Sequence, residues 1–220
     1  MLQPSLQHSI LLSSSLSVQQ NLQDPLQCAW FMLTKNSPIE IRKFDSKIHN
    51  RSDFDCGHER LNNYLKVSAT KLQKGDFTRI YVALEPGHPN VLGYHAINFG
   101  ELDASALEKA PRGAPAHMQM PVLFLGQIAV TKDAGGNGIG GILMHHAFEK
   151  AVQLADQAGC WAIILDAVDD DGEEAFQRRI GWYEDFGFQV MPSKKCRMFM
   201  TLKDVRGAVE ARKKALQEAG

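Results

Sequence analysis

The sequence lacks the features that define several large classes of protein. Its 220 residues include four cysteines, and none of these forms a C-x-x-C pair or lies near a histidine at the spacing of metal ligands. No apolar run approaches the length that spans a bilayer, and the N-terminus has no basic region of the kind that begins a signal peptide. The sequence therefore predicts a cytoplasmic protein with free thiols, without a disulfide framework, a zinc site or a membrane helix.

An excess of charge is also missing, since the formal net charge is −1. Basic residues outnumber acidic ones in segments 41–80 and 190–220, whereas acidic residues dominate segment 101–189. The two basic segments would form one face for a nucleic acid, or they are simply solvated surface. A hydrophobic fraction of 44% in a chain of this length indicates one globular domain with a sizeable core.

Residues 1–31 have almost no charge and no sustained hydrophobic period, and they are rich in Gln, Ser and Leu. This composition predicts a poorly ordered extension. Met32 begins a more ordinary sequence, so the alternative interpretation is that the native protein starts downstream of residue 1. A mass spectrum of the native protein that includes residue 1 would contradict this alternative.

The remainder alternates between strand and helix patterns, which predicts one α/β domain with a mixed sheet. Strand patterns cover 39–44, 78–85, 91–102, 121–130, 160–168 and 197–202. Helix patterns cover 57–75, 135–159 after a glycine-rich opening, a segment that starts within 169–174, and a surface tail at 206–220. The turn signal PGHPN predicts a hairpin between the second and third strands, and the apolar run 121–130 predicts a central strand buried on both faces.

The densest motif is a glycine-rich loop between the strand at 121–130 and the next helix. Five glycines fall within seven residues, at positions 135, 136, 138, 140 and 141. Glycines let the backbone approach a ligand closely, and unpaired N–H groups at a helix N-terminus favour an anion such as a pyrophosphate. The loop lacks the Lys-Ser/Thr pair of a P-loop and lies too late in the chain for a dinucleotide fingerprint. A glycine-rich turn without a ligand is the alternative.

The stretch IAVTKDAGGNGIGGILMHHAFEKA resembles the coenzyme A-binding motif of the GCN5-related N-acetyltransferases, the GNAT family. The resemblance covers residues 38–205. The stretches FDCGHERLNNYLKVSATKLQKG, VLGYHAINFGEL and MPVLFLGQIAV further resemble a branch of bacterial toxins from toxin–antitoxin pairs, which acetylate the α-amino group of an aminoacyl-tRNA. The resemblance implies the GNAT fold, a single α/β domain with a mixed, splayed central β-sheet flanked by helices.

It also implies acetyl-CoA as cosubstrate without a metal, an aminoacyl-tRNA acceptor, a ribbon-helix-helix antitoxin and a homodimer. The backbone of Ile128, Ala129 and Val130 would hold the pantetheine arm, and the N–H of Ile128 or Val130 would meet the oxyanion. The pyrophosphate would be held by Gly135, Gly136, Asn137, Gly138, Ile139, Gly140 and Gly141. Two residues depart from the pattern. Gly135 stands where the family has Gln or Arg, and Gln127 stands where the toxin branch commonly has a basic residue.

The stretch AFQRRIGWYEDFGF, residues 175–188, fits the family's acid motif, aromatic-Tyr-x-x-x-Gly-aromatic, in two competing registers. Gln177 takes the tyrosine position in the first register, and Tyr183 takes it in the second. In the family, the Gly-aromatic pair leads into an extended segment with a proline and then the closing strand, as Gly187 and Phe188 do here. We therefore assign the proton donor for the thiolate leaving group to Tyr183. A packed aromatic with its hydroxyl at the surface is the alternative.

No side chain in the sequence stands out as a general base. His95 and His117 are considered for this role with ordered water as the alternative, while His145 and His146 are expected at the surface or core edge of their helix. Asp169, Asp170 and Asp171 are expected to cap the following helix, with magnesium binding as the alternative. Candidate phosphate contacts for tRNA are Lys66, Lys71, Lys74, Arg79, Lys194, Lys195 and Arg197.

Three functions remain open at this point. The first is a toxin-like acetyltransferase that acts on aminoacyl-tRNA, and the second is a GNAT enzyme whose acceptor is a small amine, a peptide N-terminus or a lysine. The third is an inactive module that binds acyl-CoA or a partner. Retention of Tyr183 together with Gly138 and Gly140 argues against the third, whereas Gln127 and the near-neutral charge keep the second open.

Overall fold

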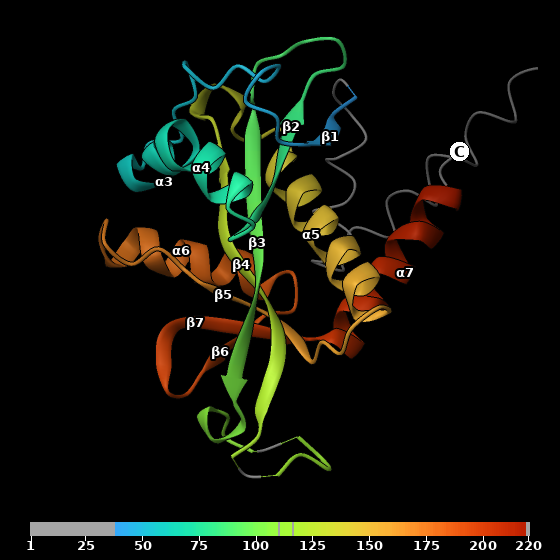
Figure 1. The fold of residues 1–220 in the computed structure, drawn as a ribbon. Helices are drawn as coiled ribbons and strands as arrows, with labels where there is room; N and C mark the ends of the chain where they lie inside the picture. The colour runs from blue at the N-terminus through green and yellow to red at the C-terminus, as the bar shows by residue number, and fades with distance from the viewer. Residues whose placement is uncertain (1–37, 110, 116, 219–220) are drawn as a thin grey trace, which may run out of the picture.

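A computed structural model describes residues 38–218 except residues 110 and 116, so the predictions for residues 1–31 lie outside the described part. The centre of the molecule is a seven-stranded sheet with the order β1-β2-β3-β4-β5-β7-β6 (Figure 1). Only β4 and β5 are parallel, and the other neighbouring pairs are antiparallel. The predicted single α/β domain with a mixed sheet is confirmed.

The first half of the sheet is a meander of β1 (Glu40–Lys43), β2 (Arg79–Leu84) and β3 (Gly93–Asp103). Successive strand residues point to opposite faces, and β2 shows this clearly. Val82 packs with Leu65 in one core cluster, whereas its neighbour Ala83 packs with Leu143 in another. Helices therefore cover both faces of this part of the sheet, and the predicted hairpin of β2 and β3 is confirmed.

The helical segment predicted at 57–75 consists of three consecutive pieces. These are α3 (Glu59–Asn63), the π-helical turn η2 (Tyr64–Ser68) and α4 (Ala69–Lys74). The segment ends at Gly75, as its sequence predicts, but the π-helical turn was not expected. Leu65 and Ala69 are fully buried and hold the segment against the sheet. Figure 1 shows α3 and α4 on one side of β3 and β4, with α5 on the other.

The second half begins with β4 (Gln119–Val130), which pairs along the whole length of β3. The short 3₁₀ turn η3 (Ala104–Ala106) lies between these two strands, and the 3₁₀ turn η4 (Lys132–Ala134) follows β4. Next come α5 (Ile139–Ala155) and β5 (Ala162–Asp166). The helix ends at Ala155, four residues earlier than the glycine at position 159 suggested.

The chain closes with α6 (Glu173–Glu184), β6 (Gln189–Met191), β7 (Lys194–Thr201) and α7 (Leu202–Glu218). The short strand β6 was not predicted as a strand. The last helix begins at Leu202 and buries Val205 and Val209 in a core cluster shared with α5 and α6, so only part of it is a surface helix. Figure 1 shows α7 beside α5.

The sequence led us to expect free cysteines and no membrane-spanning helix. The three cysteines among them, Cys56, Cys160 and Cys196, are free. No helix within 38–218 is long and apolar enough to cross a bilayer.

Candidate functional site

The strands β4 and β5 pair over a short stretch and then separate. Val122 to Phe124 pair with Ala162 to Ile164, but β4 continues to Val130, and the last residues of β5 pair only with β7. The register of β4 against β3 shifts at Gly126, where β4 has one extra residue. Such a bulge bends a strand, and here it lies where β4 leaves β5. We call residues 125–130 of β4 and the facing end of β5 the β4–β5 splay.

The backbone direction in this part of β4 follows from one hydrogen bond. The N–H of Thr131 donates to the carbonyl of Leu92 at 2.8 Å, on the β3 side. Backbone groups of successive strand residues point to opposite edges, so those of Ala129 also point toward β3. The backbone groups of Ile128 and Val130 therefore point into the β4–β5 splay, where they can pair with an extended ligand.

The glycine loop adopts the conformation that its sequence suggests. Gly136 and Gly138 have φ values of 76° and 75°, in the left-handed region that glycine adopts without strain. Gly138 is the N-cap of α5, and no side chain caps the helix there. The first helical bond runs from the N–H of Ile142 to the carbonyl of Gly138 at 3.2 Å. The N–H groups of residues 139–141 therefore have no carbonyl within the helix, which suits a pyrophosphate.

Two glycines of the loop are in crowded positions. A Cβ on Gly135 would lie 3.0 Å from the carbonyl oxygen of Lys132, so a side chain there would require the backbone to shift by a few tenths of an ångström. A Cβ on Gly140 would lie 3.3 Å from Cζ2 of Trp182 and 3.9 Å from a methyl of Val130. Gly140 is thus where the end of β4, the start of α5 and the end of α6 meet.

Tyr183 follows Trp182 on α6 and is 7% exposed. Its ring packs edge-on against Trp182 at 5.0 Å and against Phe188 at 6.0 Å, measured between ring centroids. Burial raises the pKa of Tyr183 to about 12, although the charge of Arg179 opposes the shift. The phenol therefore stays protonated at neutral pH. Among the described residues the hydroxyl has no hydrogen-bond partner, and its assignment as the acid remains a prediction.

The two registers of residues 175–188 differ in their surroundings. Gln177 is exposed, and its amide donates to Glu173 one turn earlier at 2.7 Å. Phe176 and Tyr183, seven residues apart, are both buried in the core cluster around Phe148. Only the second register therefore places its working position in the interior, one residue after the Trp182 that contacts Gly140.

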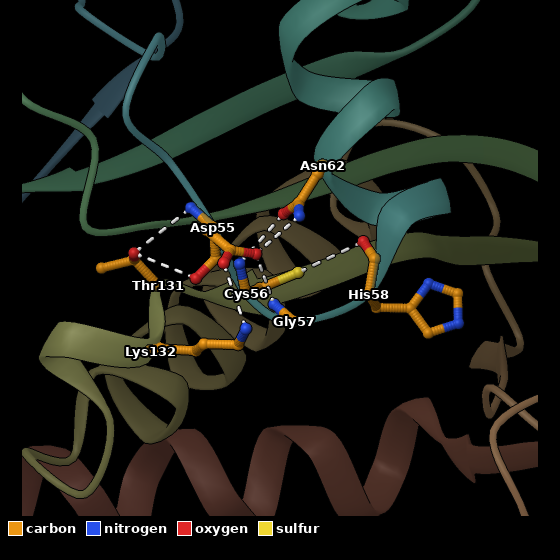
Figure 2. A network of polar contacts seen from close by, with 7 residues as sticks. All are labelled: Asp55, Cys56, Gly57, His58, Asn62, Thr131 and Lys132. Carbon is orange, nitrogen blue, oxygen red and sulfur yellow. Dashed lines mark hydrogen bonds and ion pairs between the residues drawn. The ribbon is translucent and has the colours of Figure 1, made fainter.

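The segment before α3 is attached to the chain that follows β4 through the backbone and side chain of Asp55 (Figure 2). The carbonyl of Asp55 accepts from the N–H of Lys132 at 2.8 Å and from the hydroxyl of Thr131 at 3.2 Å. Its carboxylate accepts from the N–H of Gly57, the amide of Asn62 and the ammonium of Lys132. These donors lower the pKa of Asp55 to about 2. The start of α3 is thus held at the end of β4.

The predicted helix cap by three aspartates is wrong. The N-cap of α6 is Gly172, with φ of 102° and no side-chain cap bond. Asp170 instead pairs with His58, 2.7 Å from its Nε2, and Asp171 pairs with Arg179. The hydrogen bond from His58 lowers the pKa of Asp170. No group of three or more acidic, cysteine or histidine side chains within the described residues has a geometry that would hold a metal ion.

The histidines considered from the sequence differ in their surroundings, and the backbone of one of them, His95, pairs with Ile128 of β4. His95 is fully buried, with Nε2 2.7 Å from Nδ1 of His146 on α5, and burial lowers the pKa of both side chains. His117 is exposed in the connection to β4. His145 was expected near the surface but is 2% exposed between the rings of Phe148 and Phe186. His58 was not considered, although it directly follows the Cys-Gly pair of the FDCG stretch.

The candidate phosphate contacts fall into two groups. Lys194 and Arg197 pair with Asp166, and Arg79 pairs with Asp76, so their charge is largely compensated. The other four have no salt bridge among the described residues: Lys66, Lys71, Lys74 and Lys195. Three of these belong to the segment of η2 and α4, which therefore carries most of the uncompensated positive charge of the predicted set.

Comparisons with known proteins agree with this geometry. The family model described as the acetyltransferase (GNAT) domain matches residues 76–190. A probable toxin, TacT of Sinorhizobium fredii, is 33% identical over 167 residues, which covers 76% of this chain and 92% of the relative. A tRNA-acetylating toxin of Mycobacterium tuberculosis is 27% identical over 159 residues, which covers 72% of this chain and 89% of the relative.

The fold also matches solved structures. The toxin AtaT, in a complex with acetyl-methionyl-tRNAfMet, superposes with a TM-score of 0.68 at 20% identity, and the match covers 77% of this chain and 98% of AtaT. A tyrosine-to-phenylalanine mutant of AtaT, bound to acetyl-CoA and the C-terminus of the antitoxin AtaR, superposes with a TM-score of 0.62. That match has 20% identity and covers 76% of this chain and 96% of AtaT.

Proposed function

This chain belongs to the GNAT acetyltransferases, and from that premise we propose that it transfers the acetyl group of acetyl-CoA to the α-amino group of an aminoacyl-tRNA. The observation that carries the proposal is the convergence at Gly140 of the glycine loop, the free edge of β4 and the helix of Tyr183. The acceptor is supported by the relatives, one named a probable toxin and the other a tRNA-acetylating toxin.

Acetyl-CoA supplies the activated thioester, and the backbone holds it. The N–H groups of Ile139, Gly140 and Gly141 would bind the pyrophosphate at the start of α5, within the loop of Gly135 to Gly138. The backbone of Ile128 and Val130 faces the splay and would pair with the pantetheine arm, while Ala129 between them pairs with β3. An N–H of the same two residues would stabilise the oxyanion of the tetrahedral intermediate.

Tyr183 would donate a proton to the departing thiolate. Burial keeps the phenol protonated at neutral pH, which is the state that a general acid requires. The contact of Trp182 with Gly140 places the end of α6 beside the loop that would hold the cofactor.

Two macromolecules, a tRNA and an antitoxin, are proposed as partners of this chain. The uncompensated lysines on η2 and α4 would contact tRNA phosphates. A ribbon-helix-helix antitoxin is proposed as the protein partner, since an AtaT structure contains an antitoxin segment. Because aminoacyl-tRNA is an intracellular substrate, we also propose that the protein acts in the cytoplasm.

A labelling experiment tests the proposed acceptor. The purified protein is incubated with labelled acetyl-CoA and, in parallel, with bulk aminoacyl-tRNA, deacylated tRNA, free amino acids and a lysine-containing peptide. We expect label on the aminoacyl-tRNA that is released with the amino acid by mild base. Label on the peptide or the free amino acids, with none on the tRNA, would replace the proposed acceptor with a small or peptide amine. Growth arrest on expression in bacteria would support the toxin role.

A further inference from the structure

His58 and Asp170 connect two segments that are far apart in the sequence. Nε2 of His58 lies 2.7 Å from Oδ1 of Asp170, and the side chains are 16% and 52% exposed. His58 is the N-cap of α3, in a segment attached through Asp55 to Lys132 just after β4. Asp170 lies in the connection from β5 to α6. Because β4 and β5 are parallel, their carboxyl ends are at the same edge of the sheet, so the pair spans the open end of the β4–β5 splay.

The position of Asp170 is also tied to the helix of the proposed acid. Arg179 on α6 donates to the carbonyl of Val168 at 2.7 Å and pairs with Asp171, on either side of Asp170. Arg179 lies one turn before Tyr183 on α6. The carboxylate that holds His58 is therefore positioned by the element that carries Tyr183.

The hydrogen bond to Asp170 fixes the chemistry of the imidazole. A carboxylate oxygen accepts a hydrogen bond from a nitrogen that bears hydrogen, so Nε2 is the donor, and in the neutral imidazole Nδ1 then retains a lone pair. Nδ1 of His58 is buried and has no hydrogen-bond partner among the described residues. A buried acceptor without a donor is destabilising, and an ammonium N–H of the acceptor would supply the missing donor.

We propose that His58 is the general base that deprotonates the acceptor amine, and that Asp170 is the residue that orients it. The inference rests on the proposed acetyl transfer, but not on the identity of the amine. An N–H bond of the ammonium breaks, and its proton passes to Nδ1. The freed nitrogen lone pair attacks the acetyl carbon, and the C–S bond breaks after the tetrahedral intermediate. The thiolate takes the proton of Tyr183, and the second proton that the nitrogen loses as the amide forms passes through water to the tyrosinate. His58 releases its own proton to water, so both side chains return to their starting states.

Three other charged groups surround the imidazole and enter its pH dependence. Asp170 and Asp171 approach from the connection before α6, and Arg60 approaches from the first turn of α3. The two carboxylates stabilise the imidazolium, and the guanidinium opposes it. Removal of the charge of Asp170 should therefore change the pH profile of the reaction.

The test compares His58→Gln, Asp170→Asn and the control His88→Gln, a variant of an exposed loop histidine. Gln can still donate to Asp170 and preserve the connection, but it cannot accept a proton from the amine. We expect His58→Gln to lower kcat by about 100-fold or more and to remove the acidic limb of the pH profile, with acetyl-CoA affinity unchanged. Asp170→Asn should retain part of kcat and shift that limb to lower pH, and His88→Gln should match wild type.

Two results would overturn the assignment. One is a His58→Gln enzyme with kcat within threefold of wild type and the same acidic limb, since the pair would then be structural only. The other is a nitrogen NMR spectrum of the free protein in which neutral His58 carries its proton on Nδ1. The kinetics use whichever amine the wild-type enzyme acetylates, and the NMR measurement needs no turnover. A wrong assignment of aminoacyl-tRNA as the acceptor is therefore distinguishable from a wrong assignment of His58 as the general base.

Discussion

The indole of Trp182 on α6 is in contact with Gly140 in the first turn of α5. A Cβ built on Gly140 would lie 3.3 Å from Cζ2 of that indole, which is tighter than an ordinary contact between carbon atoms. The contact fixes the distance between the glycine loop and the end of α6. Because Tyr183 is the next residue, the position of the proposed acid depends on the absence of a side chain at Gly140.

Gly140→Val tests this dependence. The branched side chain would displace Trp182 and crowd the first turn of α5, so we expect acetyl-CoA affinity to fall by about tenfold or more, equal to at least 1.4 kcal/mol. Calorimetry with acetyl-CoA measures the change. The control is Gly207→Ala on α7, where an added Cβ meets no atom within 4 Å and affinity should not change. Equal affinity of Gly140→Val and wild type would mean that the loop does not bind the cofactor.

Tyr183→Phe tests the proposed acid and its register together. Loss of the hydroxyl should lower kcat by about 10²- to 10⁴-fold without changing acetyl-CoA affinity, because the ring and its packing remain. Steady-state kinetics and calorimetry separate the two effects. A second variant adds Gln177→Tyr, which returns a tyrosine to the exposed first register. This double variant should stay inactive, and recovery of its activity would move the acid to the first register.

Tyr183 also illustrates which parts of the site can be predicted from short stretches of sequence. Hydrophobic alternation and glycine positions are local properties, so they predicted most strands, the helix after the glycine loop and the loop itself. The register at 175–188 was predicted because the strand β7 follows the second Gly-aromatic pair. The two positions differ physically in the structure, since Gln177 is exposed and Tyr183 is buried.

Interactions between distant segments could not be predicted in this way. The aspartates before α6 have the composition of a helix cap, but Asp170 pairs with His58, 112 residues away. His145 belongs to α5, whose residues have mixed polarity. Its ring is covered by Phe186, which lies just after the end of α6. The π-helical turn at Tyr64–Ser68 has no distinctive sequence, and its Leu65 packs with residues of β2 and β3. Each of these features depends on which segments the fold brings together.

The stability of the protein should fall in mild acid because of the buried histidines. Burial lowers the pKa of His146 to about 4, and Lys150 and Arg212 add to the shift. The pKa of His146 in the folded protein is therefore lower than its value near 6.5 in the unfolded chain. Its contribution to the free energy of unfolding is complete above pH 6.5. It is lost as the pH falls toward 4, because the unfolded chain binds a proton that the folded protein does not. We expect a loss of about 1–2 kcal/mol between pH 7 and pH 5 from His146.

Urea unfolding as a function of pH measures this loss. His146→Gln can still hydrogen-bond to His95 but does not titrate, so its stability should depend less on pH in this window. His95 is fully buried and should leave a residual slope in the same direction. His88→Gln, in an exposed loop, should keep the wild-type slope. A wild-type stability that is constant from pH 7 to pH 5 would contradict the prediction.

The lysines of α4 should contribute to the recognition of tRNA more than those already paired. Lys71 and Lys74 are exposed and have no salt bridge among the described residues, whereas Lys194 lies 2.9 Å from Asp166. We expect Lys71→Ala and Lys74→Ala each to raise the KM for aminoacyl-tRNA by about 3- to 10-fold, with the KM for acetyl-CoA unchanged. Each should reduce the salt dependence of tRNA binding by about 0.7–0.9 in the slope of log K against log salt concentration.

Lys194→Ala should change both quantities much less, because its ammonium is already neutralised by a carboxylate. A larger effect of Lys194→Ala than of the α4 variants would place the tRNA on the β6–β7 side of the sheet.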